Sequence, residues 1–126
     1  MPALLGLTEA EPGAAGTEED LRGRWLRDDA GAVIGTVEEL LIDEPERQGR
    51  LLKVSGRRLV PVDAIIRIGP DTVWINRSAA HVAATPALPP RGADQAYLEA
   101  VYAQYGYYPF WAPGYAYPSY PAYPPE

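Results

Sequence analysis

The sequence predicts an all-β fold: a small β-barrel of five to six short strands, followed by a short helix and an extended tail rich in proline and tyrosine. Turn-forming residues recur at short intervals between positions 21 and 85, where β-branched and apolar residues also cluster. Residues 33–43 carry apolar side chains on both faces, which fits a bent barrel strand better than a flat, one-sided sheet. All nine tyrosines lie beyond position 96, which marks a separate C-terminal part.

Composition divides the chain into three parts: a flexible acidic leader (1–20), a barrel domain (21–85) and a helix with a Pro/Tyr-rich tail (86–126). The leader holds five acidic residues and no basic one, so it accounts for most of the net charge of −6. The barrel region is close to neutral. It therefore lacks the basic surplus that is typical of a nucleic-acid-binding domain.

The first half of the barrel region predicts two strands. Residues 22–27 form the first strand, and the turn 28–31 ends it. Residues 33–43 form a longer strand with a kink near Gly35. Residues 44–49 then make a turn, because proline fixes one backbone angle and glycine frees the exit.

The second half continues in the same way. Residues 51–55 alternate between apolar and polar side chains and predict a strand, and a further apolar segment covers 57–62. The Gly-Pro-Asp sequence at 69–71 predicts a turn, and residues 72–76 alternate strictly. Residues 78–84 fit either one helical turn or an edge segment.

A helix is predicted over residues 93–106, where Asp94 can cap the start and Gly106 can end it. One face of this helix is apolar and aromatic. Its residues are Tyr97, Leu98, Val101, Tyr102 and Tyr105. This face either packs on the barrel or meets a partner, and the sequence leaves both alternatives open.

Several classes of function are disfavoured by what the sequence lacks. It has no cysteine, which excludes disulfides, thiolate metal sites and cysteine nucleophiles. It has no glycine-rich phosphate loop, serine-nucleophile elbow or zinc-protease motif, so we expect neither an enzyme nor a cofactor. The single histidine, His81, is expected at the barrel surface. No secretory signal or transmembrane segment is apparent, which favours a cytoplasmic protein, free or peripheral to a membrane complex.

Two charged clusters are candidate sites. The acidic cluster could hold a hard cation, but its spacing matches no calcium loop, so a solvated barrel rim without metal is expected. Its residues are Glu38, Glu39, Asp43, Glu44 and Glu46. The basic cluster could contact RNA phosphates. Its residues are Arg47, Arg50, Lys53, Arg57 and Arg58. Nearby acids and the absence of interleaved aromatic residues favour ordinary charged strand edges instead.

The tail is the predicted partner-binding segment. Its prolines exclude helix and favour an extended polyproline II conformation, while each tyrosine offers an apolar ring and a hydroxyl. Such a segment suits docking into a groove of a protein partner, and an unstructured tail is the alternative. The binding candidates are Tyr107, Tyr108, Phe110, Trp111, Tyr115, Tyr117, Tyr120 and Tyr123.

Four motifs in order resemble the PRC-barrel domain family: LRGRWL at 21–26, DAGAVIGTV at 29–37, LIDE at 41–44 and LVPVDAI at 59–65. The family includes the cytoplasmic part of the photosynthetic reaction centre H subunit, the second domain of a ribosome maturation factor, and free-standing bacterial proteins. This chain resembles the free-standing type. The resemblance implies a docking module without a shared catalytic centre, and no acidic residue of the H subunit can be matched to this chain.

These observations together predict a non-enzymatic adaptor or structural module that binds protein partners. It could act as a peripheral subunit of a larger, membrane-associated complex, and a homodimer remains open. Two alternatives remain: an RNA- or ribosome-associated binding module, and a self-assembling structural or stress-related protein.

Overall fold

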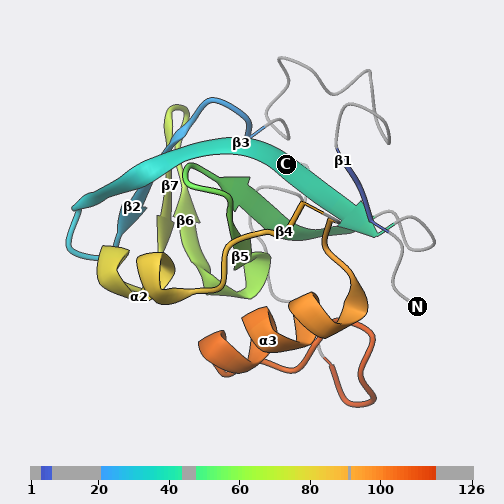
Figure 1. The fold of residues 1–126 in the computed structure, drawn as a ribbon. Helices are drawn as coiled ribbons and strands as arrows, with labels where there is room; N and C mark the ends of the chain where they lie inside the picture. The colour runs from blue at the N-terminus through green and yellow to red at the C-terminus, as the bar shows by residue number, and fades with distance from the viewer. Residues whose placement is uncertain (1–3, 7–20, 44–47, 91, 116–126) are drawn as a thin grey trace.

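The computed structural model describes residues 4–6, 21–43, 48–90 and 92–115, and all that follows concerns these residues (Figure 1). The strands are β1 (Leu4–Gly6), β2 (Trp25–Asp28), β3 (Val33–Asp43), β4 (Gln48–Val54), β5 (Arg58–Pro61), β6 (Ile65–Ile68) and β7 (Thr72–Ile75). A 3₁₀ turn, η2 (Val62–Ala64), joins β5 to β6, and two helices follow, α2 (Ala79–Ala84) and α3 (Gln95–Tyr105). The predicted all-β fold with a short C-terminal helix is confirmed.

The strands form one bent sheet in the order β5-β4-β3-β2-β7-β6, and β1 pairs separately with β3. All pairs are antiparallel except β2 and β7, which run parallel. Strand β3 connects the two parts of the sheet, because its first part pairs with β2 and its second part with β1 and β4 (Figure 1). The register shifts along β3 at its pairings with both β2 and β4, as expected for a bent barrel strand.

Helix α3 completes the core. The Asp94 side chain accepts a hydrogen bond from the Tyr97 backbone N–H at 2.9 Å, and Gly106 ends the helix with a φ of 79°. Figure 1 shows α3 beneath the barrel, where it contacts β5. The residues of its predicted apolar face, Tyr97, Leu98, Val101, Tyr102 and Tyr105, are all buried. The alternative in which this face packs on the chain's own barrel is therefore the one that the structure shows.

Some boundaries differ from the sequence-based expectation. Strand β2 begins at Trp25 rather than at residue 22, because Gly23 adopts a φ of 86° in a turn. Residues 79–84 are helical, and the Ser78 hydroxyl caps this helix by accepting a hydrogen bond from the His81 backbone N–H at 3.1 Å. Strand β1 lies in the segment that was expected to be a flexible leader. Its three residues are too few to be recognised without their neighbour β3. No described helix is long and apolar enough to cross a membrane.

Gly35 is required where β3 passes close to Ser55. The Ser55 hydroxyl accepts a hydrogen bond from the Thr36 backbone N–H at 2.9 Å. A Cβ atom at Gly35 would lie 2.9 Å from Ser55 Oγ and 3.0 Å from Ser55 Cβ, which is closer than such atoms pack.

We therefore predict that Gly35→Ala lowers the free energy of unfolding by about 1–3 kcal/mol, measured by urea denaturation. Adding Ser55→Gly should recover part of this loss, and an unchanged midpoint for Gly35→Ala would contradict the steric constraint.

Candidate functional site

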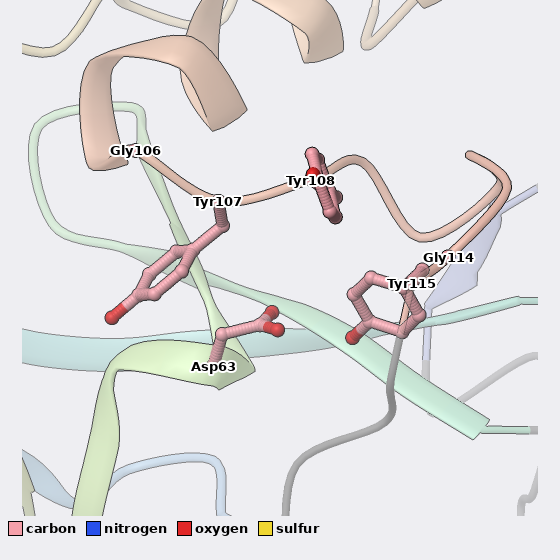
Figure 2. A pocket seen from close by; sticks show the side chains of 6 residues that line it. All are labelled: Asp63, Gly106, Tyr107, Tyr108, Gly114 and Tyr115. Carbon is pink, nitrogen blue, oxygen red and sulfur yellow. The ribbon is translucent and has the colours of Figure 1, made fainter.

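A pocket of about 300 Å³, open to solvent, lies between η2 and the segment that follows α3. The chain reverses at Gly106, and a second glycine, Gly114, has a φ of 85° in the returning loop. Between them, a backbone hydrogen bond from Ala112 N–H to Pro109 carbonyl at 3.0 Å closes a turn. The pocket is lined by Asp63, Gly106, Tyr107, Tyr108, Gly114 and Tyr115 (Figure 2).

A buried ion pair anchors the segment 107–115. Arg50 of β4 donates to Asp43 of β3 at 3.0 Å, and their side chains are only 5% and 7% exposed. The Arg50 guanidinium lies 4.8 Å from the centroid of the Phe110 ring and 5.7 Å from that of Tyr115. Trp111 meets the Phe110 ring edge to face at 5.0 Å. Aromatic rings therefore cover a charge pair that belongs to the barrel, which fixes the path of the chain around the pocket.

Asp63 supplies the carboxyl of the pocket. Its neighbours in η2, Val62 and Ala64, are buried in the core, whereas Asp63 is only partly buried. Figure 2 shows its carboxyl between the rings of Tyr107 and Tyr115. Burial raises the pKa of Asp63 above its ordinary value, although its own backbone N–H, the Tyr115 hydroxyl and the Arg50 charge each lower it. The atom Oδ1 is shielded from solvent and has no hydrogen-bonding partner among the described residues.

The three tyrosine walls differ in how firmly they are held. Tyr107 donates to the Asn76 side-chain oxygen at 3.3 Å, and its ring lies 5.1 Å from the Arg77 guanidinium. Tyr115 has a buried hydroxyl, and burial together with the Asp63 charge raises the pKa of that phenol. Tyr108 is 66% exposed and forms the outer wall. The pocket thus has two anchored walls and one that solvent reaches.

The predicted partner-binding tail is only partly available as a surface. Of its described residues, Tyr107, Tyr108 and Tyr115 come together around the pocket. Phe110 is buried in the core cluster and Trp111 is partly buried against it, so these two rings hold the fold together. The remaining candidates, Tyr117, Tyr120 and Tyr123, lie outside the described residues.

The structure places the described residues of the basic cluster in different surroundings. Arg50 is buried in its ion pair, so it is unavailable to a phosphate. Arg57 donates to the Leu88 carbonyl at 2.8 Å, and Arg58 donates to the Ala83 carbonyl at 3.2 Å. These two arginines tether the linker between the helices. Lys53 is half-buried, and Arg47 lies outside the described residues.

The acidic cluster is also divided. Glu38 is exposed and Glu39 is half-buried on β3, as a rim would require. Asp43 contradicts the rim prediction, because it is buried against Arg50. Glu44 and Glu46 lie outside the described residues. Among the residues that the structure describes, no group of three metal-ligating side chains is assembled.

His81 lies near the surface at α2 and meets the Tyr105 ring, with centroids 4.7 Å apart. Its pKa is lowered by partial burial and by the Arg77 charge, while a hydrogen bond to the Gln104 backbone raises it. The surface placement that the sequence predicted therefore agrees with the structure.

Sequence reasoning missed a solvent-facing row of side chains across four strands, in which Val33 and Arg67 are exposed and Arg27 and Trp74 are partly buried. Val33 of β3, Arg27 of β2, Trp74 of β7 and Arg67 of β6 lie side by side in the strand register. The Arg67 guanidinium lies 4.3 Å from the centroid of the Trp74 ring. Trp25, two residues before Arg27 on the same face, is 47% exposed. Alternation along each strand was visible in the sequence, but the parallel pairing of β2 with β7 was not.

Comparison with known proteins identifies one family. The family model of the PRC-barrel domain matches residues 18–82, which is about half of the chain. No curated protein matches the sequence at a significant level. The matched range contains η2 and both members of the buried ion pair, whereas the tyrosine walls of the pocket lie beyond it.

The stability of the fold should depend on the buried ion pair between Asp43 and Arg50. Asp43→Asn leaves the Arg50 guanidinium buried without its counter-charge and should cost about 3–5 kcal/mol of unfolding free energy, measured by urea denaturation. The double variant Asp43→Leu with Arg50→Met removes both charges and should be more stable than Asp43→Asn. Equal stability of the wild type and Asp43→Asn would show that the pair does not anchor the fold.

The protonation of Asp63 should make the stability of the protein depend on pH. Because its folded-state pKa lies above the ordinary value of 3.8, the ionised carboxyl disfavours folding at neutral pH. We predict that Asp63→Asn is at least as stable as the wild type at pH 7. As pH falls through the raised pKa toward 3.8, the wild type should gain stability relative to the variant. Urea midpoints of both proteins across this range measure the difference, and a wild type that loses stability relative to the variant on acidification would contradict the sign.

Proposed function

The chain belongs to the PRC-barrel family, and from this premise we propose that it is a non-enzymatic adaptor that binds a protein partner through the pocket between η2 and the segment 106–115. Membership of the family indicates a small binding or structural module, and PRC-barrel domains often mediate protein interactions. One observation supports this pocket as the binding site. Side chains from the barrel and from the C-terminal segment together form an open pocket with an exposed aromatic wall, Tyr108.

The chemistry of the pocket supports binding rather than catalysis. Among the described lining residues Asp63 is the one carboxyl, and the hydroxyl that interacts with it is the phenol of Tyr115. The raised pKa of the Tyr115 phenol keeps that hydroxyl neutral at ordinary pH, so it can donate or accept a hydrogen bond but does not serve as a base. An adaptor of this kind would act in the cytoplasm, as a peripheral subunit of a larger assembly.

The solvent-facing row on the other part of the sheet favours a second candidate function, an RNA-associated module. Trp25 offers a ring on which a base can stack, and Arg27 and Arg67 flank the partly buried Trp74. This arrangement supplies the interleaved aromatic residues that the basic cluster at 47–58 lacks. Its charge is modest, because the exposed Asp29 and Asp71 lie at the ends of the same strands. The protein-adaptor proposal therefore comes first.

A test must spare helix α3. A chain that ends at Thr85 would remove six buried side chains of the core and would report on folding rather than on binding. Point variants on exposed residues avoid this problem. Tyr108→Ala alters the pocket wall, and Trp25→Ala is a matched aromatic truncation on the solvent-facing row.

We predict that the full chain, used as bait with chemical cross-linking in lysate of its own host, captures a defined protein partner, which is identified by mass spectrometry. Tyr108→Ala should lose this capture and Trp25→Ala should retain it, because only the first variant removes a wall of the pocket. Both variants should stay close to the wild-type urea midpoint, since Tyr108 is 66% exposed, Trp25 is 47% exposed and neither belongs to the buried core.

The opposite pattern would overturn the proposal in favour of the second candidate. In that case a labelled single-stranded RNA would bind, Trp25→Ala would weaken it, and Arg67→Gln would reduce the salt dependence of binding by about one unit of slope. A capture that neither aromatic variant affects would reject both surfaces.

A further inference from the structure

The pocket has the composition of a cage for a cation. The rings of Tyr107, Tyr108 and Tyr115 stand around it, and the Asp63 carboxyl lies at its floor (Figure 2). The face of a tyrosine ring attracts a cation within about 6 Å of its centroid. The rings of this segment already act in that way within the protein, because Tyr115 lies 5.7 Å from the Arg50 guanidinium and Tyr107 lies 5.1 Å from that of Arg77.

The carboxyl at the floor lacks a cationic partner of its own. The positive charge that lowers the pKa of Asp63 is that of Arg50, which is already paired with Asp43 at 3.0 Å. Asp63 Oδ1 has no hydrogen-bonding partner among the described residues. Burying a carboxylate without a full set of partners is costly, and a cation that enters the pocket would relieve that cost.

We propose that this pocket binds the ammonium group of a lysine side chain from a protein partner, with Asp63 as the counter-ion and the three tyrosines as the cage. The inference rests on the proposed function, in which the pocket receives a protein partner, and it adds the chemistry that the pocket recognises. The barrel supplies the charge, and the segment 106–115 supplies the aromatic walls.

A compact ammonium fits this pocket better than a guanidinium does. The Asp63 carboxyl already interacts with its own backbone N–H and with the Tyr115 hydroxyl, and these contacts restrict the planar two-oxygen edge that a bidentate arginine fork requires. An ammonium needs only one free acceptor oxygen, and it can turn its other two donors toward the tyrosine hydroxyls or water. The four-carbon stem of lysine can lie along the tyrosine rings.

The source of the ammonium follows from the shape of the pocket. It is open to solvent, so a side chain can enter while its backbone stays outside. The outer wall, Tyr108, is 66% exposed and can contact residues that flank the lysine. A free amine would leave this exposed ring without a contact, which favours a protein ligand.

Two arginines near the pocket carry like charge, but both are already engaged by acceptors. Arg50 binds Asp43, and Arg77 donates to the backbone carbonyl of Tyr105 and to the Asn76 side chain. Asp63 is the charged group that lines the pocket itself. The charge of Arg50 is balanced by Asp43, and Arg77 is held by neutral acceptors outside the lining, so the charged group that a ligand in the pocket meets directly is the Asp63 carboxyl.

The test uses the full chain and four probes: the peptide acetyl-Gly-Gly-Lys-Gly-Gly-amide, the same peptide with Nε-acetyl-lysine, the same peptide with norleucine, and butylammonium. Binding is followed by NMR through the ring resonances of the pocket tyrosines. We expect the lysine peptide to bind at least about tenfold more tightly than the acetylated and norleucine peptides, because both lack the charge. It should also bind more tightly than butylammonium.

Variants assign the binding to the cage. Asp63→Asn should weaken the lysine peptide at least about tenfold while leaving the fold at least as stable at pH 7, so loss of binding cannot come from unfolding. Tyr108→Ala should weaken it about threefold to tenfold, and the matched control Trp25→Ala should not change it.

Three outcomes would overturn the inference. Equal binding of the lysine and norleucine peptides would show an apolar pocket, and equal binding of butylammonium and the peptide would show a site for small amines. Undiminished binding of the lysine peptide by the Asp63→Asn variant would show that Asp63 is not the counter-ion. If the captured partner still depends on Tyr108 in any of these cases, the proposed adaptor function stands and only its lysine chemistry is rejected. If capture is independent of Tyr108, the adaptor function itself is rejected.

Discussion

The buried ion pair between Asp43 and Arg50 is the constraint on which the C-terminal half of the molecule depends. It joins the end of β3 to β4, and a buried charge pair requires both good geometry and protection from water. Phe110 supplies that protection with its ring 4.8 Å from the guanidinium, and Tyr115 lies close by. The covering rings belong to a segment some 60 residues further along the chain. Covering the pair holds the loop after α3 against the barrel, and residues of that loop line the pocket.

A second set of contacts holds α3 in the position from which that loop starts. Arg57 and Arg58 donate to the backbone carbonyls of Leu88 and Ala83, which draws the linker along β5. Tyr97 of α3 donates to the Pro86 carbonyl at 2.8 Å, and burial raises the pKa of its phenol to about 12. The basic residues that suggested a nucleic-acid surface are thus part of the connection between barrel and helix. Their positive charge is used locally, on carbonyl oxygens that would otherwise face solvent or the core.

Local signals explain which elements the sequence could predict. The bounds of β3, the Asp94 cap and the Gly106 helix end follow from patterns within a few residues, and the structure has all three. The site could not be found in that way. Asp63 stands within a motif shared with the PRC-barrel family, but the tyrosines that face it lie more than 40 residues away. The role of Arg50 could not be predicted for the same reason. The sequence around an arginine does not show whether it is buried, and the Phe110 ring that covers Arg50 is distant in the chain.

The placement of Asp63 argues that this pocket is adapted to binding rather than to stability. An asparagine at the same position would carry no charge to be buried, and the raised pKa of Asp63 shows that the folded protein disfavours its ionised form. Charged groups that lower the stability of the unliganded protein are concentrated at functional sites, where a bound ligand can supply the missing interaction. Tyr108 supports the same argument from the opposite side, since an aromatic ring left 66% exposed contributes little to the core. The carboxyl without a cation of its own and the exposed ring line the same pocket, so one cationic ligand would satisfy both.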